Sequence, residues 1–127
     1  LFRLAEIYLT RAEAKFRLGN VNMVGNDGKN ALDDIKLVQD RANRAPDLQA
    51  TSVDAQTLID EWCREFFMEG RRRSDLVRFG LFSGSKYLWS FKGGVPNGSG
   101  IESHFDIYPI PGNETKNNPN MTQNPKY

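Results

Sequence analysis

The residues best able to do chemistry lie in the stretch "DEWCREFFMEGRRRSDLVRFG", residues 60–80, which carries the densest pattern of charge in the chain. Glu65 and Glu69 are four residues apart, so a helix would place both carboxylates on one face, as a paired general acid and base require. No nucleophile, histidine or glycine-rich pocket accompanies this pair. Because a catalytic constellation is missing, we predict no catalytic residues and no enzymatic activity.

Two other interpretations of this stretch remain open. The run "GRRR" at residues 70–73 could bind an anion at the start of a helix, where backbone N–H groups are unpaired. The interpretation that the sequence favours is structural, because opposite charges at helical spacing form ion pairs that tie helices to the rest of a protein. The expected pairs are Glu61 with Arg64, Glu69 with Arg72 or Arg73, and Asp75 with Arg71 or Arg78.

A second set of residues suits binding better than catalysis. In "SKYLWSFKGG" the aromatic residues Tyr87, Trp89 and Phe91 alternate, and an extended segment would place their rings on one side. Such rings can stack on the apolar C–H face of a pyranose, while a few polar groups bond its hydroxyls. The same rings could instead hold the loop to the core, and the sequence favours this second interpretation.

Composition excludes several classes of function. The net charge of +1 gives no field strong enough to indicate a nucleic-acid partner. We expect no metal site and no cofactor, since His104 is the single histidine and has no partners at ligand spacing. Cys63 is the single cysteine, which excludes an intrachain disulfide, and we expect it to be a small buried side chain. No apolar run approaches the ~20 residues of a membrane helix.

Hydrophobic periodicity predicts a mainly α-helical chain of about one domain, beginning with a helical hairpin over residues 1–45. The first helix covers Leu1–Leu18, with Leu4 in its buried stripe and Ile7 on a second apolar face. The second helix covers Asn30–Asn43, with Asn30 as its N-cap. The hairpin resembles one tetratricopeptide-like unit, which buries both faces only against neighbours. We therefore expect this chain to be an incomplete piece of a longer protein.

Further helices and an irregular end follow. Charged helices are predicted over residues 54–80, with Asp54 as the N-cap of the first. Residues 81–104 form a glycine-rich variable loop with at most one short strand or hairpin. In the final region, 105–127, "FDIYPI" alternates well enough for an edge strand, the kind that tolerates proline.

The last residues are expected to form an extended, proline-rich C-terminal segment that packs on the helices. Its prolines order the chain before docking and so lower the entropy lost. Glutamine and asparagine side chains there can satisfy backbone groups that form no ladder. Tyr127 would anchor the end by burying its ring.

Three segments in this order are similar to the C-terminal part of the SusD/RagB family: "RLAEIYLTRAEAKFRLGN", "REFFMEGRRRSDLVRFG" and "YPIPGNE…NPNMTQNPKY". The resemblance covers nearly all of the chain except the loop 83–104. The residues that match the family motifs, and to which it assigns a structural role, include Glu61, Arg64, Glu65, Glu69, Arg72, Asp75, Arg78, Pro109, Pro111, Gln123, Asn124, Pro125 and Tyr127. Arg73 and Ser74 depart from the aromatic residues that the family commonly has.

The resemblance implies an α-rich SusD-like fold and non-catalytic binding of nutrient oligo- or polysaccharides. Members are surface-exposed outer-membrane lipoproteins of Bacteroidetes-type bacteria, which pass glycans to a TonB-dependent, SusC-like transporter. The signal and lipid anchor would then lie upstream of this fragment. The alternative function is a tetratricopeptide-like protein–protein interaction module, which regular upstream repeats without a signal peptide would support.

Overall fold

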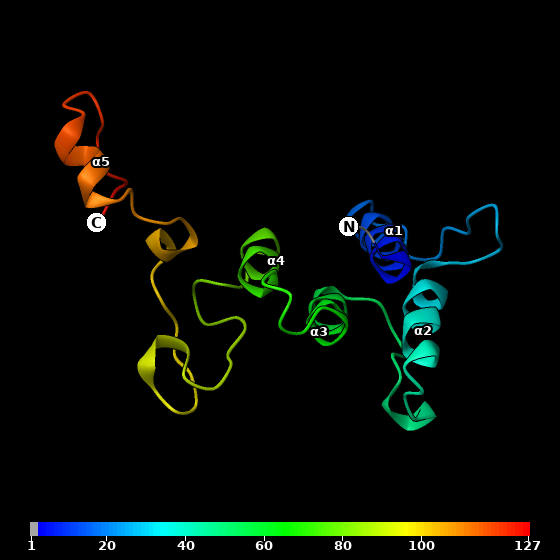
Figure 1. Ribbon diagram of the computed structural model, residues 1–127. Coiled ribbons are helices and arrows are strands. Elements are labelled where there is room, and N and C mark those ends of the chain that lie inside the picture. Colours follow the sequence, from blue (N-terminus) through cyan, green and yellow to red (C-terminus); the bar gives the residue numbers. More distant parts are fainter. Residues whose placement is uncertain (1–2) are drawn as a thin grey trace. The chain divides into compact units, whose positions relative to one another are not determined.

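The structure is a computed structural model that describes residues 3–127. Over these residues it is mainly α-helical and contains no strand, which confirms the predicted fold class (Figure 1). The helices are α1 (Leu4–Arg17), α2 (Ala31–Arg41), α3 (Ala55–Glu65), α4 (Arg72–Arg78) and α5 (Gly112–Asn117), with 3-10 turns at Pro46–Leu48, Lys92–Gly94 and Ser103–Asp106. The chain divides into two compact units, one ending at Asp75 and the other running from Leu76 to Tyr127.

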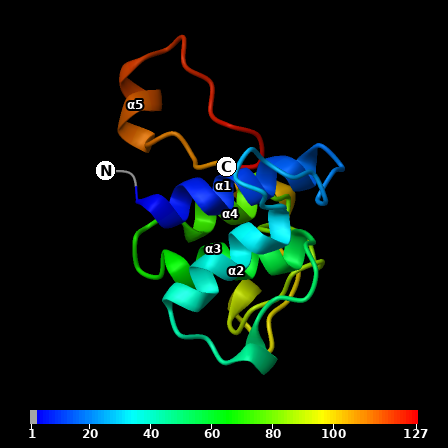
Figure 2. The same cartoon turned by 90° about the vertical axis from the view of Figure 1, so that its right-hand side faces the viewer.

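The first unit is built on the helices α1, α2 and α3, which lie against one another (Figure 2). Helices α1 and α2 form the predicted helical hairpin, and α3 contacts both of them. Alanines at the contacts allow the backbones to approach closely, and larger aliphatic residues fill the space between. The buried apolar residues of these helices are Ala5, Leu9, Ala12, Ala31, Ile35, Val38, Leu58, Ile59 and Trp62.

Side-chain caps fix the starts of α2 and α3. The Asn30 side chain accepts hydrogen bonds from the backbone N–H groups of Leu32 and Asp33, at 2.9 and 3.1 Å. The Asp33 carboxylate in turn accepts from the Asn30 N–H at 2.9 Å, which completes a capping box. Asp54 accepts from the N–H of Thr57 at 2.7 Å and begins α3. Both predicted N-caps are therefore confirmed.

The buried stripe of α1 agrees only in part with the predicted one. Leu1, the first residue of the predicted helix, lies outside the described residues. Leu4 was expected inside, yet its side chain is 67% exposed, and Ile7 on the second face is 54% exposed. Ala5, Leu9 and Ala12, which belong to the predicted stripe, are buried as expected, and the two alanines allow a close approach of the neighbouring helices.

The second unit contains turns in place of the predicted strand. Residues 105–110 were expected to form an edge strand, but the N–H of Phe105 bonds to the Glu102 carbonyl and that of Ile107 to the His104 carbonyl. These local turn bonds bend the backbone at Ser103–Asp106, so the strand prediction was wrong. Within the loop 81–104 the pairing is limited to one antiparallel bridge, between Gly84 and Ile101.

The C-terminal segment is also less extended than predicted. It contains the short helix α5, which follows Pro111 directly and begins with a hydrogen bond from the Glu114 N–H to the Pro111 carbonyl at 2.9 Å. Proline is tolerated at a helix start because the missing N–H would have no partner there. The predicted extended course therefore fails over residues 112–117, and the docking of this segment on the helices stays a prediction.

The end of the chain folds back on the residues that precede α5. Gln123 makes two hydrogen bonds of 2.8 Å with the backbone of Ile110, accepting from its N–H and donating to its carbonyl. The Asn124 side chain donates to the Tyr108 carbonyl at 2.7 Å, and the Tyr127 hydroxyl donates to the Ile107 carbonyl at 2.9 Å. Amide side chains thus satisfy backbone groups as predicted, whereas the Tyr127 ring is 43% exposed and is not buried.

Candidate functional site

A buried cluster of charges joins α1 to α2. The carboxylate of Asp34 is fully buried, and Arg11 and Lys15 of α1 both donate to it. The Arg11 Nε–Asp34 Oδ2 distance is 2.9 Å, and the Lys15 Nζ–Asp34 Oδ2 distance is 3.2 Å. Hydrogen bonds to Asp34, and then to Asp27, raise the pKa of the Arg11 guanidinium above its ordinary value. This cluster stabilises the hairpin, because each buried charge has a partner.

The sequence analysis missed this cluster. Asp34 falls in the first turn of the predicted second helix, where an acidic residue is expected to be solvated, and the sequence singles out neither Asp34 nor Lys15. The available signal was the spacing of Arg11 and Lys15, which places two cations on one face of α1. Lys15 is only 3% exposed. The spacing could not predict this burial, because the element that packs on that face of α1 was not known from the sequence.

The glutamates at residues 61, 65 and 69 do form ion pairs, but most partners come from distant segments. Glu61 pairs with Arg64 at 2.7 Å, as predicted, and also accepts from Gln39 at 2.7 Å. Glu65 and Glu69 both pair with Arg3, at 3.0 and 2.7 Å. Because Arg3 bridges the two carboxylates and Arg41 also pairs with Glu65, this arrangement favours the structural interpretation over a general acid and base.

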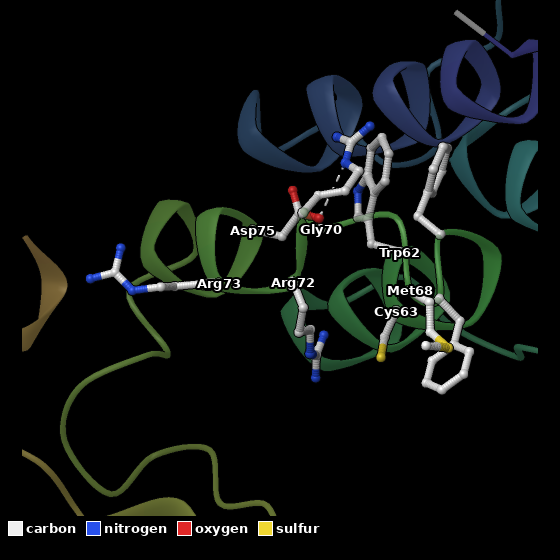
Figure 3. Close-up of a pocket in the computed structure, with 10 residues that line it drawn as sticks. Trp62, Cys63, Met68, Gly70, Arg72, Arg73 and Asp75 are labelled. Atoms are coloured by element: carbon white, nitrogen blue, oxygen red, sulfur yellow. Dashed lines mark ion pairs between the residues drawn. The ribbon is translucent and has the colours of Figure 1, made fainter. Parts of the chain in front are cut away.

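An apolar pocket of about 350 Å³ lies where α3 turns into α4 (Figure 3). Its lining includes Trp62, Cys63 and Met68. The guanidinium of Arg71 lies over the Trp62 ring, 4.4 Å from its centroid, and over the neighbouring Phe66 ring at 4.6 Å. Cys63 is half-buried beside this pocket, whereas the sequence predicted a buried side chain.

The arginines at this pocket do not form the anion site that the sequence left open as an alternative. Arg71 pairs with Glu6 at 2.6 Å and with Asp75 at 3.5 Å. Burial pulls the pKa of Arg71 down, but the hydrogen bond to Glu6 and the charge of Asp75 raise it overall. Arg72 donates to the Ile59 carbonyl at 2.8 Å, and Arg72 and Arg73 point in different directions in Figure 3. The guanidinium groups therefore do not converge on one anion.

Replacing Asp75 by asparagine tests the structural role of this pair. Asp75 is 4% exposed and its carboxylate faces Arg71, so Asp75→Asn is expected to lower the free energy of unfolding by about 1–3 kcal/mol. Urea unfolding of the intact protein measures the loss. Asp40→Asn, at an exposed carboxylate, serves as the matched control and should change stability by less than about 0.5 kcal/mol. Equal stability of Asp75→Asn and the parent protein would place Asp75 in solvent.

In the second unit, two of the three predicted binding aromatics form a small core inside the loop. Trp89 stacks on Phe82 with ring centroids 5.9 Å apart, and its centroid lies 6.3 Å from that of Tyr87. Lys92 completes the cluster: its Nζ lies 4.6 Å from the Trp89 centroid and donates to the Tyr87 carbonyl at 2.7 Å. These contacts hold the loop together from within, whereas the interpretation in which the rings hold the loop to the core stays a prediction.

The sequence does not single out Lys92, which follows Phe91 in a glycine-rich loop. Its side chain is among the most buried in the protein, with 2% exposure. Burial lowers the pKa of Lys92 below its ordinary value, and the nearby negative charge of Asp106 opposes this shift. Sequence offered no signal, because a lysine between a phenylalanine and two glycines is normally solvated.

Phe91 does not share a side with Trp89 in the predicted way. The expected alternation requires an extended backbone, but the φ angle of Phe91 is +67° and a 3-10 turn follows at Lys92–Gly94. The Phe91 side chain is 70% exposed. The Phe91 ring is therefore exposed, whereas the rings of Tyr87 and Trp89 pack inside the loop.

His104 packs against other rings. Its ring centroid lies 4.0 Å from that of Phe105 and 5.1 Å from that of Tyr127. Among residues 3–127, no group of three or more histidine, cysteine, aspartate and glutamate side chains is arranged to hold a metal ion. In the same part of the chain, no helix is long and apolar enough to cross a membrane.

The fold and these clusters define a mainly α-helical protein whose charged motif stabilises its helices and whose glycine-rich loop contains a small aromatic cluster. A model of the SusD family matches residues 1–127, and the chain belongs to that family. The chain is 53% identical over 127 residues to the starch-binding protein SusD of Bacteroides thetaiotaomicron. The alignment covers 100% of this chain and 21% of that relative, so the chain spans about a fifth of the relative's length.

Proposed function

We propose that the full-length protein binds nutrient oligo- or polysaccharides without cleaving them. The observation that carries this proposal is the identity of 53% to a protein named for starch binding, across every residue of this chain. Starch-like α-glucans are accordingly the first ligands to test. The tetratricopeptide-like interaction module is not favoured as an alternative, since the family match covers the whole chain.

The pairing of the carboxylates supports binding without hydrolysis. Glycoside hydrolysis uses two carboxyl groups that flank the scissile bond, one of them as a proton donor. Glu65 and Glu69, the pair with suitable spacing, instead share the guanidinium of Arg3. Glu65 is also held by Arg41 at 2.7 Å, which leaves this carboxylate engaged on two sides.

The proposal extends to location and partner, as the SusD/RagB resemblance implies. The protein would be a lipoprotein on the outer-membrane surface, held by a lipid anchor upstream of the residues studied. It would deliver its glycan to a TonB-dependent, SusC-like transporter. Within this chain, the loop that carries Tyr87, Trp89 and Phe91 is the proposed contact region for the glycan.

Affinity gel electrophoresis of the intact protein tests the function directly. Soluble starch cast in the gel is expected to retard migration, and a parallel panel of other polysaccharides defines the preference. The same preparation incubated with starch should release no reducing ends. Retention by none of the polysaccharides would refute glycan binding, while release of reducing ends would refute the non-catalytic role.

A further inference from the structure

Phe91 combines a strained backbone with an exposed ring. Its φ and ψ angles of 67° and 8° lie in the left-handed region, which is strained for a residue other than glycine. Among the described residues, it is the only aromatic residue with a positive φ angle. Because its side chain is 70% exposed, burial of the ring does not offset this strain. Strain retained at an exposed aromatic residue points to a function for the ring.

The surrounding loop imposes this conformation on Phe91. Its N–H bonds to the Pro96 carbonyl at 3.3 Å, and its own carbonyl accepts from Gly94 at 3.0 Å. Across the loop, the Ser99 N–H bonds to the Lys92 carbonyl at 2.9 Å. The backbone passes so close at Gly98 that an added Cβ would lie 2.5 Å from the Trp89 carbonyl oxygen. The loop is therefore closed by contacts that fix the position of Phe91.

The side chain that follows Phe91 anchors the loop from the inside. Lys92 is buried beneath the turn, where its Nζ donates to the Tyr87 carbonyl at 2.7 Å and lies over the Trp89 ring. The rings of Tyr87, Trp89 and Phe82 are thus used to support the turn. Tyr87 and Trp89 are therefore packed because they support the turn, whereas Phe91 is exposed to solvent.

The chemistry of the turn suits an uncharged ligand. Lys92 is the only charged residue between Leu88 and Ile101, and it is 2% exposed. Ser90 and Asn97 are exposed neutral side chains that can both donate and accept hydrogen bonds. An exposed apolar ring beside neutral polar groups matches a pyranose, which has one apolar C–H face and a rim of hydroxyls.

We infer that Phe91 is the aromatic contact of this loop for a neutral sugar ring, with Trp89, Tyr87 and Lys92 acting as its support. The inference rests on the proposed glycan-binding function and narrows the proposed contact region of the loop to the Phe91 side chain. The strained conformation of Phe91 is already present before the sugar binds. A loop that is fixed in this way loses little conformational entropy on binding, which suits a binding role.

Substitutions at Phe91 separate the role of the ring from that of the backbone. Phe91→Ala in the intact protein is expected to weaken the affinity for maltoheptaose about three- to tenfold, the equivalent of one aromatic contact. Phe91→Gly should weaken binding equally while raising the melting temperature, because glycine relieves the positive φ angle. Phe91→Tyr keeps the ring and should retain affinity. Isothermal titration calorimetry and thermal unfolding provide the two readouts.

Tyr108 supplies a matched control in the same unit. Its side chain is 69% exposed, close to that of Phe91, but its φ angle is not positive. Tyr108→Ala is expected to leave the affinity for maltoheptaose unchanged. If the parent protein binds maltoheptaose and Phe91→Ala binds it equally well, the inference about Phe91 is overturned while the proposed function stands. If the parent binds neither maltoheptaose nor any polysaccharide of the panel, both fail.

Discussion

Replacing Asp34 by alanine is expected to lower the free energy of unfolding of the intact protein by about 3–5 kcal/mol. The carboxylate of Asp34 is fully buried and accepts hydrogen bonds from Arg11 and Lys15. Its removal would leave the Lys15 ammonium, which is 3% exposed, without its negative partner. A buried cation without compensation is strongly destabilising. Urea unfolding followed by far-ultraviolet circular dichroism measures the change.

Asp27→Ala is the matched control, because Asp27 pairs with the same arginine. The Arg11–Asp27 distance is 2.7 Å, but the side chain of Asp27 is 40% exposed. Surface ion pairs of this kind contribute about 0–1 kcal/mol, so this variant should remain close to the parent protein. A loss of equal size in both variants would show that burial does not determine the contribution of the Asp34 pairs.

Replacing Trp62 by alanine is expected to have a comparable effect, about 3–5 kcal/mol. Trp62 is 2% exposed and lies between α1 and the α3–α4 turn. Its indole Nε1–H donates to Glu13 at 3.0 Å, and the guanidinium of Arg71 packs over its ring in a cation–π contact. The substitution removes the ring, the hydrogen bond to Glu13 and the platform for Arg71 together. Thermal and urea unfolding of the intact protein quantify the loss.

Trp62→Phe separates these contributions. A phenylalanine retains an aromatic surface for Arg71 but cannot donate to the buried carboxylate of Glu13. We expect a smaller loss of about 1–3 kcal/mol, because the variant loses one buried hydrogen bond to a charged group. If Trp62→Phe were as destabilising as Trp62→Ala, the hydrogen bond to Glu13 would account for the whole effect, and ring packing would contribute nothing.

The helices were predictable because their signals are local. Asn30 and Asp54 precede periodic apolar residues and have side chains that can accept the first free N–H groups of a helix. The predicted starts therefore agree with the structure. The same holds for the Glu61–Arg64 pair, whose members are three residues apart on one helix.

The polar interior was not predictable, because it depends on residues far apart in sequence. Arg3 and Glu65 are separated by 62 positions, and Trp62 and Glu13 by 49. Periodicity assigns Glu13 and Lys15 to a solvated face, since it ranks side chains by hydrophobicity alone. Both are buried because α2 and α3 bring partners to them, and these partners are known only once the helices are packed.

The loop and the C-terminal segment show a different limit. The alternation of Tyr87, Trp89 and Phe91 predicted a shared side because it assumes an extended backbone, and the positive φ angle of Phe91 breaks that assumption. The prolines likewise predicted an extended end, yet Pro111 introduces the helix α5. At Phe91 and at Pro111 a single turn sets the course of the backbone. A single turn is too short to produce a detectable hydrophobic periodicity.

The double hydrogen bond between Gln123 and Ile110 has a consequence for how the end of the chain responds to solvent. A strand ladder holds an amide through many neighbouring bonds, but here one side-chain rotamer controls both backbone groups of Ile110. Rotation of that side chain exposes the Ile110 amide to deuterium without disturbing any helix. We therefore expect the Ile110 amide to exchange before the amides of the hairpin that contains Asp34.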